Sequence, residues 1–276
     1  MRALSTRRRH PLAGLLVLLL GLLVAGGLYS ALAPRAATAD TADAAAVEEG
    51  RELFLIGCAS CHGKNGQGIL AADGSSNYGP SLVGVGAASV DFQVGTGRMP
   101  MAQAAPQAPD KPPVYDEEET AQLAAYVASL GPGPAIPSEE DYSPEGIDAE
   151  GIANGGEIFR ANCTACHNSV GAGGALPDGR YAPTLSGVDD VHVYEAMLTG
   201  PQQMPVFPDE TITPEEKREV IAYINSVQDQ PDYGGFGLGG LGPVVEGVVV
   251  WLVGMGVLVA FAVWIATQGA RARRQE

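Results

Sequence analysis

The chain has 276 residues, enough for one or two domains, with 16 basic and 32 acidic side chains and a formal net charge of -16. The acidic excess lies in the middle, where positions 40–243 hold 30 acidic and 8 basic residues. This balance excludes a nucleic-acid-binding protein, because too few cations are present to neutralise phosphates. A solvated acidic surface and a docking surface for a basic partner account for the charge equally well.

The N-terminal segment, residues 1–39, begins with four arginines in its first ten positions and continues with an apolar run from Pro11 to Ala33. Positive residues before an apolar run predict an export signal or a membrane anchor whose N-terminus is inside. The sequence Ala37-Thr38-Ala39 resembles a signal-peptidase site. The run is longer than an ordinary signal core, which favours an uncleaved anchor. In both cases the residues that follow are expected outside the cytoplasm.

A five-residue motif, C-x-x-C-H, occurs twice, with its two copies 105 residues apart. It is the attachment signature of a c-type haem. Two thiols three residues apart can each form a thioether to one porphyrin edge, and the histidine that follows becomes an iron ligand. The sequence therefore predicts two covalently attached haem c groups. The residues involved are Cys58, Cys61 and His62 in the first copy and Cys163, Cys166 and His167 in the second.

Two different roles for the cysteine pairs fit the sequence less well. A thioredoxin-type redox pair requires a βαβ frame, and no such pattern is visible. A single zinc site built from both pairs would need a much shorter separation than 105 residues. Both motifs also stand in matching surroundings, which a chance occurrence would not produce.

The first predicted domain, residues 40–133, runs from an Ala/Asp/Glu-rich tether into a helix that carries Phe54 to the first motif. A glycine-rich loop follows at Gly63–Gly79, where no core strand is expected. A proline-rich loop at 105–113 leads into a helix with an acidic start at Asp116–Glu119. Apolar residues recur on one face of that helix at helical spacing. They are Leu123, Tyr126, Val127 and Leu130.

The second predicted domain, residues 134–233, repeats this order, which indicates a domain duplication. Gly155 precedes Phe159 as Gly50 precedes Phe54. The closing helix should begin at Thr213, an N-cap residue followed by proline and two acidic residues. Its expected apolar face consists of Val220, Ile221, Tyr223, Ile224 and Val227.

The C-terminal region divides into three segments. Residues 234–243 are glycine-rich and are expected to form a flexible linker. Residues 244–268 carry one charge, Glu246, and are long enough to cross a bilayer as a helix. The tail, 269–276, contains three arginines, which places the C-terminus in the cytoplasm and the middle of the chain outside it.

Two methionines are candidates for the second axial ligand of each iron. Met99 lies 37 residues after His62, and Met204 lies 37 residues after His167. Each is followed by proline in a loop that contains glycine. A thioether ligand raises the potential of the iron and closes it to small ligands, which favours electron transfer over catalysis.

Three further residues compete with these methionines. Met101, two residues beyond Met99, could substitute for it as the ligand. Met197 lies in a helical-looking stretch, Val193–Leu198, and is expected to be packing. His192 follows two aspartates and has no counterpart in the first domain, so we expect it at the surface.

These residues resemble a known family. The order C-x-x-C-H, then Gly/Ala-Pro-x-Leu-x-Gly, then a Met-Pro loop, then a helix with a tyrosine is similar to the class I cytochrome c fold, and it occurs twice. The resemblance implies a mostly α fold with two tandem class I cytochrome c domains, an N-terminal apolar signal or anchor helix and a C-terminal transmembrane helix. It also implies that the carbonyls of Pro80 and Pro183 accept hydrogen bonds from the ligating histidines.

The tandem arrangement with a C-terminal span, over about residues 45–275, resembles the dihaem cytochrome c subunit of actinobacterial menaquinol–cytochrome c reductases. The resemblance implies a subunit of a quinol–cytochrome c reductase in the cell membrane, with cytochrome b and Rieske iron–sulfur subunits as partners. Electrons would leave the Rieske protein, pass through this chain and reach a terminal haem–copper oxidase. No general acid–base pair or quinone site is visible, so no catalytic residues are expected in this chain itself.

Three alternative functions remain open from the sequence. A dihaem electron-transfer subunit of an oxidase or of a membrane-bound dehydrogenase would have the same motifs. A dihaem peroxidase needs one iron with an exchangeable ligand, which the matched methionines argue against. A free electron-shuttle cytochrome would not need the C-terminal span.

Overall fold

A computed structural model describes residues 11–32, 44–70, 77–103, 105–228 and 243–273. The chain forms two compact units, Met1–Thr41 and Ala42–Glu276, and the second unit contains both C-x-x-C-H motifs. The signal-peptidase-like sequence at 37–39 and nearly all of the expected glycine-rich linker lie outside the described residues.

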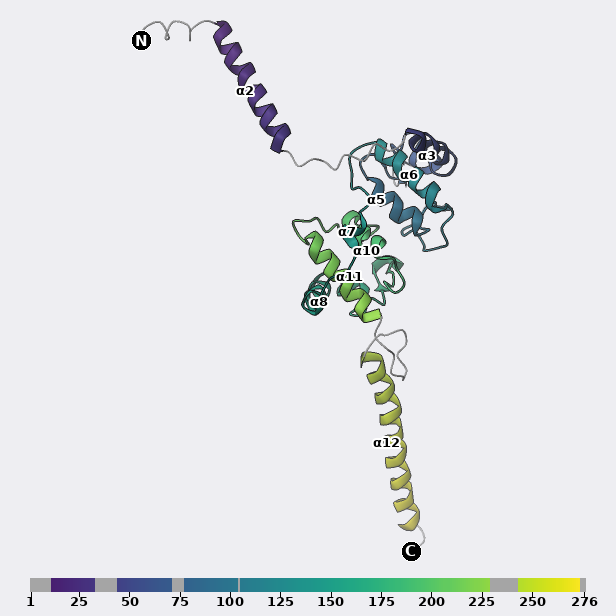
Figure 1. Cartoon of the computed structure of the whole chain (residues 1–276). Coiled ribbons are helices and arrows are strands. Elements are labelled where there is room, and N and C mark those ends of the chain that lie inside the picture. Colours follow the sequence, from purple (N-terminus) through teal and green to yellow (C-terminus); the bar gives the residue numbers. More distant parts are fainter. Residues whose placement is uncertain (1–10, 33–43, 71–76, 104, 229–242, 274–276) are drawn as a thin grey trace, which may run out of the picture. The chain divides into compact units, whose positions relative to one another are not determined.

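Helices make up most of the described chain (Figure 1). The α-helices are α2 (Pro11–Leu32), α3 (Ala44–Gly57), α4 (Ala59–His62), α5 (Ala87–Val90), α6 (Glu117–Ser129), α7 (Glu139–Tyr142), α8 (Ala149–Asn162), α9 (Thr164–His167), α10 (Asp190–Thr199), α11 (Pro214–Gln228) and α12 (Pro243–Arg273). A π-helical segment, η1 (Asp91–Gly95), continues α5, and a 3₁₀ turn, η2 (Pro177–Gly179), precedes the last strand. The strands are β1 (Ile69–Leu70), β2 (Asn77–Gly79), β3 (Gly174–Ala175) and β4 (Tyr181–Ala182).

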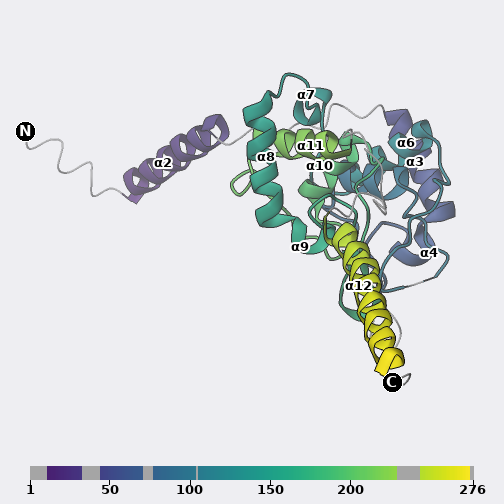
Figure 2. The same cartoon turned by 90° about the horizontal axis from the view of Figure 1, so that it is seen from below.

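Each haem-motif domain is built on one helix crossing, α3 with α6 and α8 with α11 (Figure 2). A glycine lies at each crossing. A Cβ atom on Gly50 would lie 1.9 Å from the carbonyl oxygen of Gln122, and one on Gly155 would lie 2.0 Å from that of Glu219. Real Cβ atoms do not approach backbone so closely, so only glycine permits these crossings. This explains why each domain carries glycine four residues before its buried phenylalanine.

The start of α6 is fixed by a capping box. The Asp116 side chain accepts a hydrogen bond from the Glu119 backbone N–H at 2.9 Å, and the Glu119 carboxylate accepts one from the Asp116 N–H at 3.1 Å. Two N–H groups that the helix cannot satisfy internally are thereby paired. The predicted acidic start at Asp116–Glu119 is confirmed.

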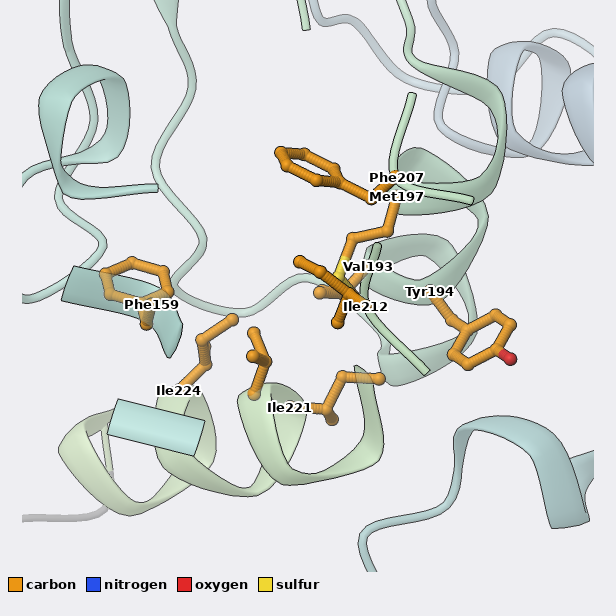
Figure 3. Close-up of a cluster of buried hydrophobic side chains, with 9 residues drawn as sticks. Phe159, Val193, Tyr194, Met197, Phe207, Ile212, Ile221 and Ile224 are labelled. Atoms are coloured by element: carbon orange, nitrogen blue, oxygen red, sulfur yellow. The ribbon is translucent and has the colours of Figure 1, made fainter. Parts of the chain in front are cut away.

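Each domain has its own apolar core. Side chains from α8, α10 and α11 converge in the second domain (Figure 3). The buried residues of this core are Phe159, Val193, Tyr194, Met197, Phe207, Ile212, Val220, Ile221 and Ile224. The buried residues of the first core are Phe54, Val90, Val94, Leu123, Ala124, Tyr126 and Val127. The predicted inward faces of α6 and α11 therefore supply much of both cores.

The glycine-rich loop of the first domain contains a short antiparallel pair, β1 with β2, and the second domain has a matching pair, β3 with β4. These strands are two or three residues long, and Leu70 in β1 is exposed. The pair in the first domain is too short and too exposed at Leu70 to be a core sheet, which agrees with the expectation that no core strand forms in this loop.

The C-terminal helix α12 contains a stretch, Val250–Gln268, that is long and apolar enough to cross a membrane. None of this stretch is buried against the rest of the described chain. The apolar part described in α2, Gly14–Gly27, is shorter than a full span. Length and composition thus make α12 a candidate membrane helix within the described residues.

Candidate haem-binding sites

The C-x-x-C-H motifs form equivalent helical turns. Cys58 is the N-cap of α4, and the His62 N–H donates to the Cys58 carbonyl at 3.0 Å. Cys163 is the N-cap of α9, and the His167 N–H donates to the Cys163 carbonyl at 2.9 Å. The single turn fixes the second cysteine and the histidine at constant positions relative to the first cysteine. All four thiols are free of disulfides.

The two histidine rings have the same hydrogen-bond partner. His62 Nδ1 lies 2.8 Å from the carbonyl oxygen of Pro80, and His167 Nδ1 lies 3.0 Å from that of Pro183. A carbonyl can only accept, so Nδ1 carries the hydrogen in each case. Nε2 then keeps its lone pair, which is the form of imidazole that binds a metal.

Burial favours the neutral, metal-binding form of His167. It lowers the pKa of this ring, and the hydrogen bond to the Pro183 carbonyl opposes that effect only in part. A neutral imidazole is available to a metal without first losing a proton.

The first cysteine of each motif is a poor thiolate. Burial raises the pKa of Cys58 to about 11, and the charge of Cys61 makes a smaller contribution in the same direction. In the same way, burial raises the pKa of Cys163 to about 11, and the charge of Cys166 makes a smaller contribution. A redox-active cysteine pair needs a depressed thiol pKa. The environment of these thiols therefore disfavours a thioredoxin-type redox pair.

A cavity of about 1000 Å³, counting the space at its mouth, opens in the second domain. Its wall includes Cys163, His167 and Met204, so the thiol, the imidazole and the thioether predicted from sequence face one volume. The rest of the wall is predominantly apolar, as is usual for sites that bind large organic ligands. These features fit a large apolar macrocycle held between two axial donors.

In the first domain, Cys58 and Met99 pack against the same apolar cluster, which surrounds Phe54. Met101 is half-buried and is not among the described side chains that pack there. In the second domain Met197 is 3% exposed and belongs to the core, as expected of a packing residue.

The two domains match known family models. Residues 47–131 match the cytochrome c family, and residues 150–224 match the family described as cytochrome c oxidase, cbb3-type, subunit III. The two matches show that both halves of the region between α2 and α12 have cytochrome c sequence character.

Curated relatives extend the match to nearly the whole chain. A protein named cytochrome bc1 complex cytochrome c subunit from Corynebacterium diphtheriae is 45% identical over 273 residues, covering 94% of this chain and 95% of the relative. Proteins of the same name from Mycobacterium tuberculosis and Mycobacterium leprae are 42% and 41% identical, covering 96% and 93% of this chain and 93% and 87% of theirs.

This chain belongs to the family of cytochrome bc1 complex cytochrome c subunits. It is a mostly helical electron-transfer cytochrome with two cytochrome c domains, and cytochrome c domains carry covalently bound haem c.

In this family member the first domain also contributes to the cavity of the second. Four first-domain residues lie in its wall: Phe92, Arg98, Gln107 and Ala108. The Gln107 side chain donates to the Tyr181 carbonyl at 2.7 Å and accepts from the Tyr181 N–H at 2.9 Å. The Ala108 N–H donates to the Gln202 side chain at 3.4 Å. The proline-rich loop at 105–113 therefore closes over the second site.

Sequence reasoning missed these residues, because no local pattern reports which loop of one domain touches the other. It was also wrong about His192. This side chain is 16% exposed and lies between Asp91 of the first domain and Asp189 of its own domain. Its ring meets the edge of Phe92 with centroids 6.2 Å apart. The contact between domains, which the sequence does not reveal, buries most of the His192 side chain.

Proposed function

We propose that this chain is the dihaem electron relay of a menaquinol-oxidising bc1-type complex in the cell membrane. It would accept electrons from the Rieske iron–sulfur protein and deliver them to a terminal haem–copper oxidase, with cytochrome b as a further partner subunit. The supporting observation is the convergence of Cys163, His167 and Met204 on one cavity in a chain whose relatives are named as bc1 complex subunits.

The proposal assigns one haem c to each domain. Bound haem iron supplies one-electron chemistry by alternating between its ferric and ferrous states. Four cysteines would hold the two macrocycles: Cys58, Cys61, Cys163 and Cys166. The axial donors would be His62 with Met99, and His167 with Met204, while Pro80 and Pro183 orient the imidazoles through their carbonyls.

The protein's own part in this function is to hold donors in place and to exclude water. Each histidine is fixed by one hydrogen bond and one helical turn. Phe159, Val193 and Leu185 contribute apolar wall to the second cavity. A dry, preorganised site needs little rearrangement when its charge changes, which suits rapid electron transfer.

We further propose that both cytochrome domains lie on the extracytoplasmic side and that α12 crosses the membrane towards a cytoplasmic tail. The arginines after the apolar stretch support this orientation. We propose the domain boundaries 40–133 and 134–233. Each of these two domains then contains one complete set of the proposed haem-binding residues.

A second candidate is a dihaem subunit of an oxidase. The observation in its favour is the match of residues 150–224 to a family named for an oxidase subunit. That match covers one domain, whereas the bc1-named relatives align with at least nine-tenths of the chain. We therefore place the bc1-type complex first.

The test is mild detergent extraction through a tag on this chain, followed by a reduced-minus-oxidised spectrum and a haem stain of the separated bands. The proposal predicts b-type and a-type haem signals together with a covalent haem band at the mass of this chain. Recovery of a-type haem without b-type haem would favour the oxidase subunit. Recovery of c-type haem alone, even in the gentlest detergents, would contradict both complexes.

A further inference from the structure

Three side chains that are not among the proposed haem ligands meet where the two domains touch, and one of them, His192, also lies in the wall of the second cavity. Asp91 comes from η1 of the first domain, and His192 and Glu195 come from α10 of the second. One potential ligand atom from each lies within 4.8 Å of the others. The three-residue spacing of His192 and Glu195 places both on one face of α10, which packs against α5 and η1.

Glu195 is the most unusual member of this cluster. Its side chain is 0% exposed, and neither carboxylate oxygen has a hydrogen-bond donor among the described residues unless Asp91 or Glu195 itself carries a proton. A buried carboxylate without a partner is strongly unfavourable. The neighbouring carboxylate of Asp91 cannot donate when it is ionised. Either a shared proton or a cation must therefore lie between the two groups.

The distance between His192 and Asp91 helps to distinguish these occupants. His192 Nε2 lies 3.8 Å from Asp91 Oδ2, which is too long for a hydrogen bond. Two ligands of one tetrahedral zinc ion, each bonded at about 2.0–2.2 Å, are roughly 3.4 Å apart. A small movement of either side chain would bring both atoms to coordination distance.

We propose that Asp91, His192 and Glu195 form a binding site for one divalent cation of the zinc class. One imidazole nitrogen and two carboxylate oxygens are an ordinary zinc donor set, and a water molecule would complete the tetrahedron. Calcium takes six to eight oxygen ligands and magnesium near-ideal octahedral geometry, so this small mixed set suits neither. Because the donors come from both domains, the ion would fasten one cytochrome domain to the other.

The surroundings of the cluster support this assignment. Phe92 packs against the His192 ring at an interplanar angle of 81°, which fixes the ring plane. Burial lowers the pKa of His192, while Asp91 and Asp189 raise it and Arg98 lowers it, so the net shift favours the neutral ring that binds metals.

A proton is the natural competitor for the site. Burial, followed by the charge of Asp91 and a hydrogen bond to it, raises the pKa of Glu195 to about 9. Without a cation, Glu195 is therefore protonated at neutral pH. Zinc must displace this proton, so binding at neutral pH should release about one proton per ion.

The experiment uses the full-length haem-containing protein in detergent, dialysed first against a chelator and then against buffered Zn²⁺. Bound zinc is measured by elemental analysis, and proton release by calorimetry in buffers of different ionisation enthalpy. We expect about one saturable zinc ion per chain and about one proton released. Glu195→Gln and His192→Ala should each weaken binding by at least about tenfold.

Asp189→Asn is the matched control, because Asp189 lies 3.9 Å from His192 Nδ1 but is not a member of the cluster. It should retain binding within about twofold. An unchanged haem spectrum verifies that each variant is folded. If Glu195→Gln or His192→Ala does not fold, Asp91→Asn is measured in its place. Absence of a saturable site, or zinc binding that survives both Glu195→Gln and His192→Ala, would overturn the proposal.

Discussion

The Gln107 side chain pairs with both backbone polar groups of Tyr181, 74 residues away and in the other cytochrome domain. The amide donates to one carbonyl and accepts from one N–H, as a neighbouring strand would. Tyr181 lies in β4, at the wall of the cavity that His167 and Met204 also line. A loop of the first domain thus completes the wall of the cavity that we propose as the haem site of the second domain.

Replacing Gln107 by alanine should loosen this wall without unfolding the protein. Two hydrogen bonds are lost, each contributing about 0.5–1.5 kcal/mol. We expect amide exchange at Tyr181 to accelerate on the order of tenfold, measured by hydrogen–deuterium exchange and mass spectrometry. Gln103→Ala, an exposed position in the neighbouring loop, is the control. Equal exchange in both variants would show that the pairing does not hold the wall.

Replacing Met204 or Met99 by leucine should leave the covalent haem in place but lower its potential. The thioether donor is lost, whereas the cysteines and the histidine remain. The expected fall is on the order of 0.1 V, because axial ligands strongly set haem potentials. Spectroelectrochemical titration of the purified protein measures it.

Met197→Leu and Met101→Leu are the matched controls for these two variants. Met197 belongs to the core, and Met101 lies two residues from the proposed ligand. Both controls should keep the potentials of the unaltered protein. If the haem potential fell in Met101→Leu but not in Met99→Leu, Met101 would be the axial ligand instead of Met99.

Replacing Ile221 by alanine should destabilise the second domain by about 2–5 kcal/mol, since it removes buried methyl groups and leaves a cavity. Ile221 is 0% exposed in the centre of its core (Figure 3). Urea unfolding followed by tyrosine fluorescence measures the loss. Ile56→Ala, at a side chain that is 84% exposed, should change stability by less than about 0.5 kcal/mol. Similar losses in the two variants would contradict the assigned core.

Stability should fall as pH rises across the range where Glu195 is protonated only in the folded protein. Its pKa is about 9 when folded and near 4.5 when unfolded, so the folded state holds one extra proton between these values. The free energy of unfolding should then decline with a slope of up to about 1.4 kcal/mol per pH unit.

Urea titrations in chelator at pH 6 and pH 8, compared between the unaltered chain and Glu195→Gln, isolate this slope. The glutamine variant has no proton to lose at this position and should show the shallower decline. Identical pH dependence in both proteins would mean that Glu195 does not carry the extra proton.

The sequence predicted those parts of the fold and site that depend on local patterns. The C-x-x-C-H spacing fixes one helical turn, so the positions of His62 and His167 relative to their cysteines follow from the motif. The acidic start of α6 at Asp116–Glu119 was equally predictable, because capping depends on residues three apart.

The features that were missed depend on contact between domains. His192 was expected at the surface, yet it packs in an edge-to-face contact with Phe92 and beside Asp91, because α10 meets η1 there. Gln107 stands in a proline-rich loop with no periodic pattern to indicate its partner. Hydrophobic spacing reports which face of a helix is buried, but it does not identify the partner surface.

The most direct test of the proposed relay is stopped-flow spectroscopy of the complex that co-purifies with this chain, mixed anaerobically with a menaquinol analogue and then with oxygen. The account predicts that two c-type haem equivalents per chain are reduced by the quinol and reoxidised by oxygen, both at least as fast as steady-state turnover. Quinol-dependent oxygen consumption that continues while the c-type haem remains oxidised, or changes more slowly than turnover, would contradict it.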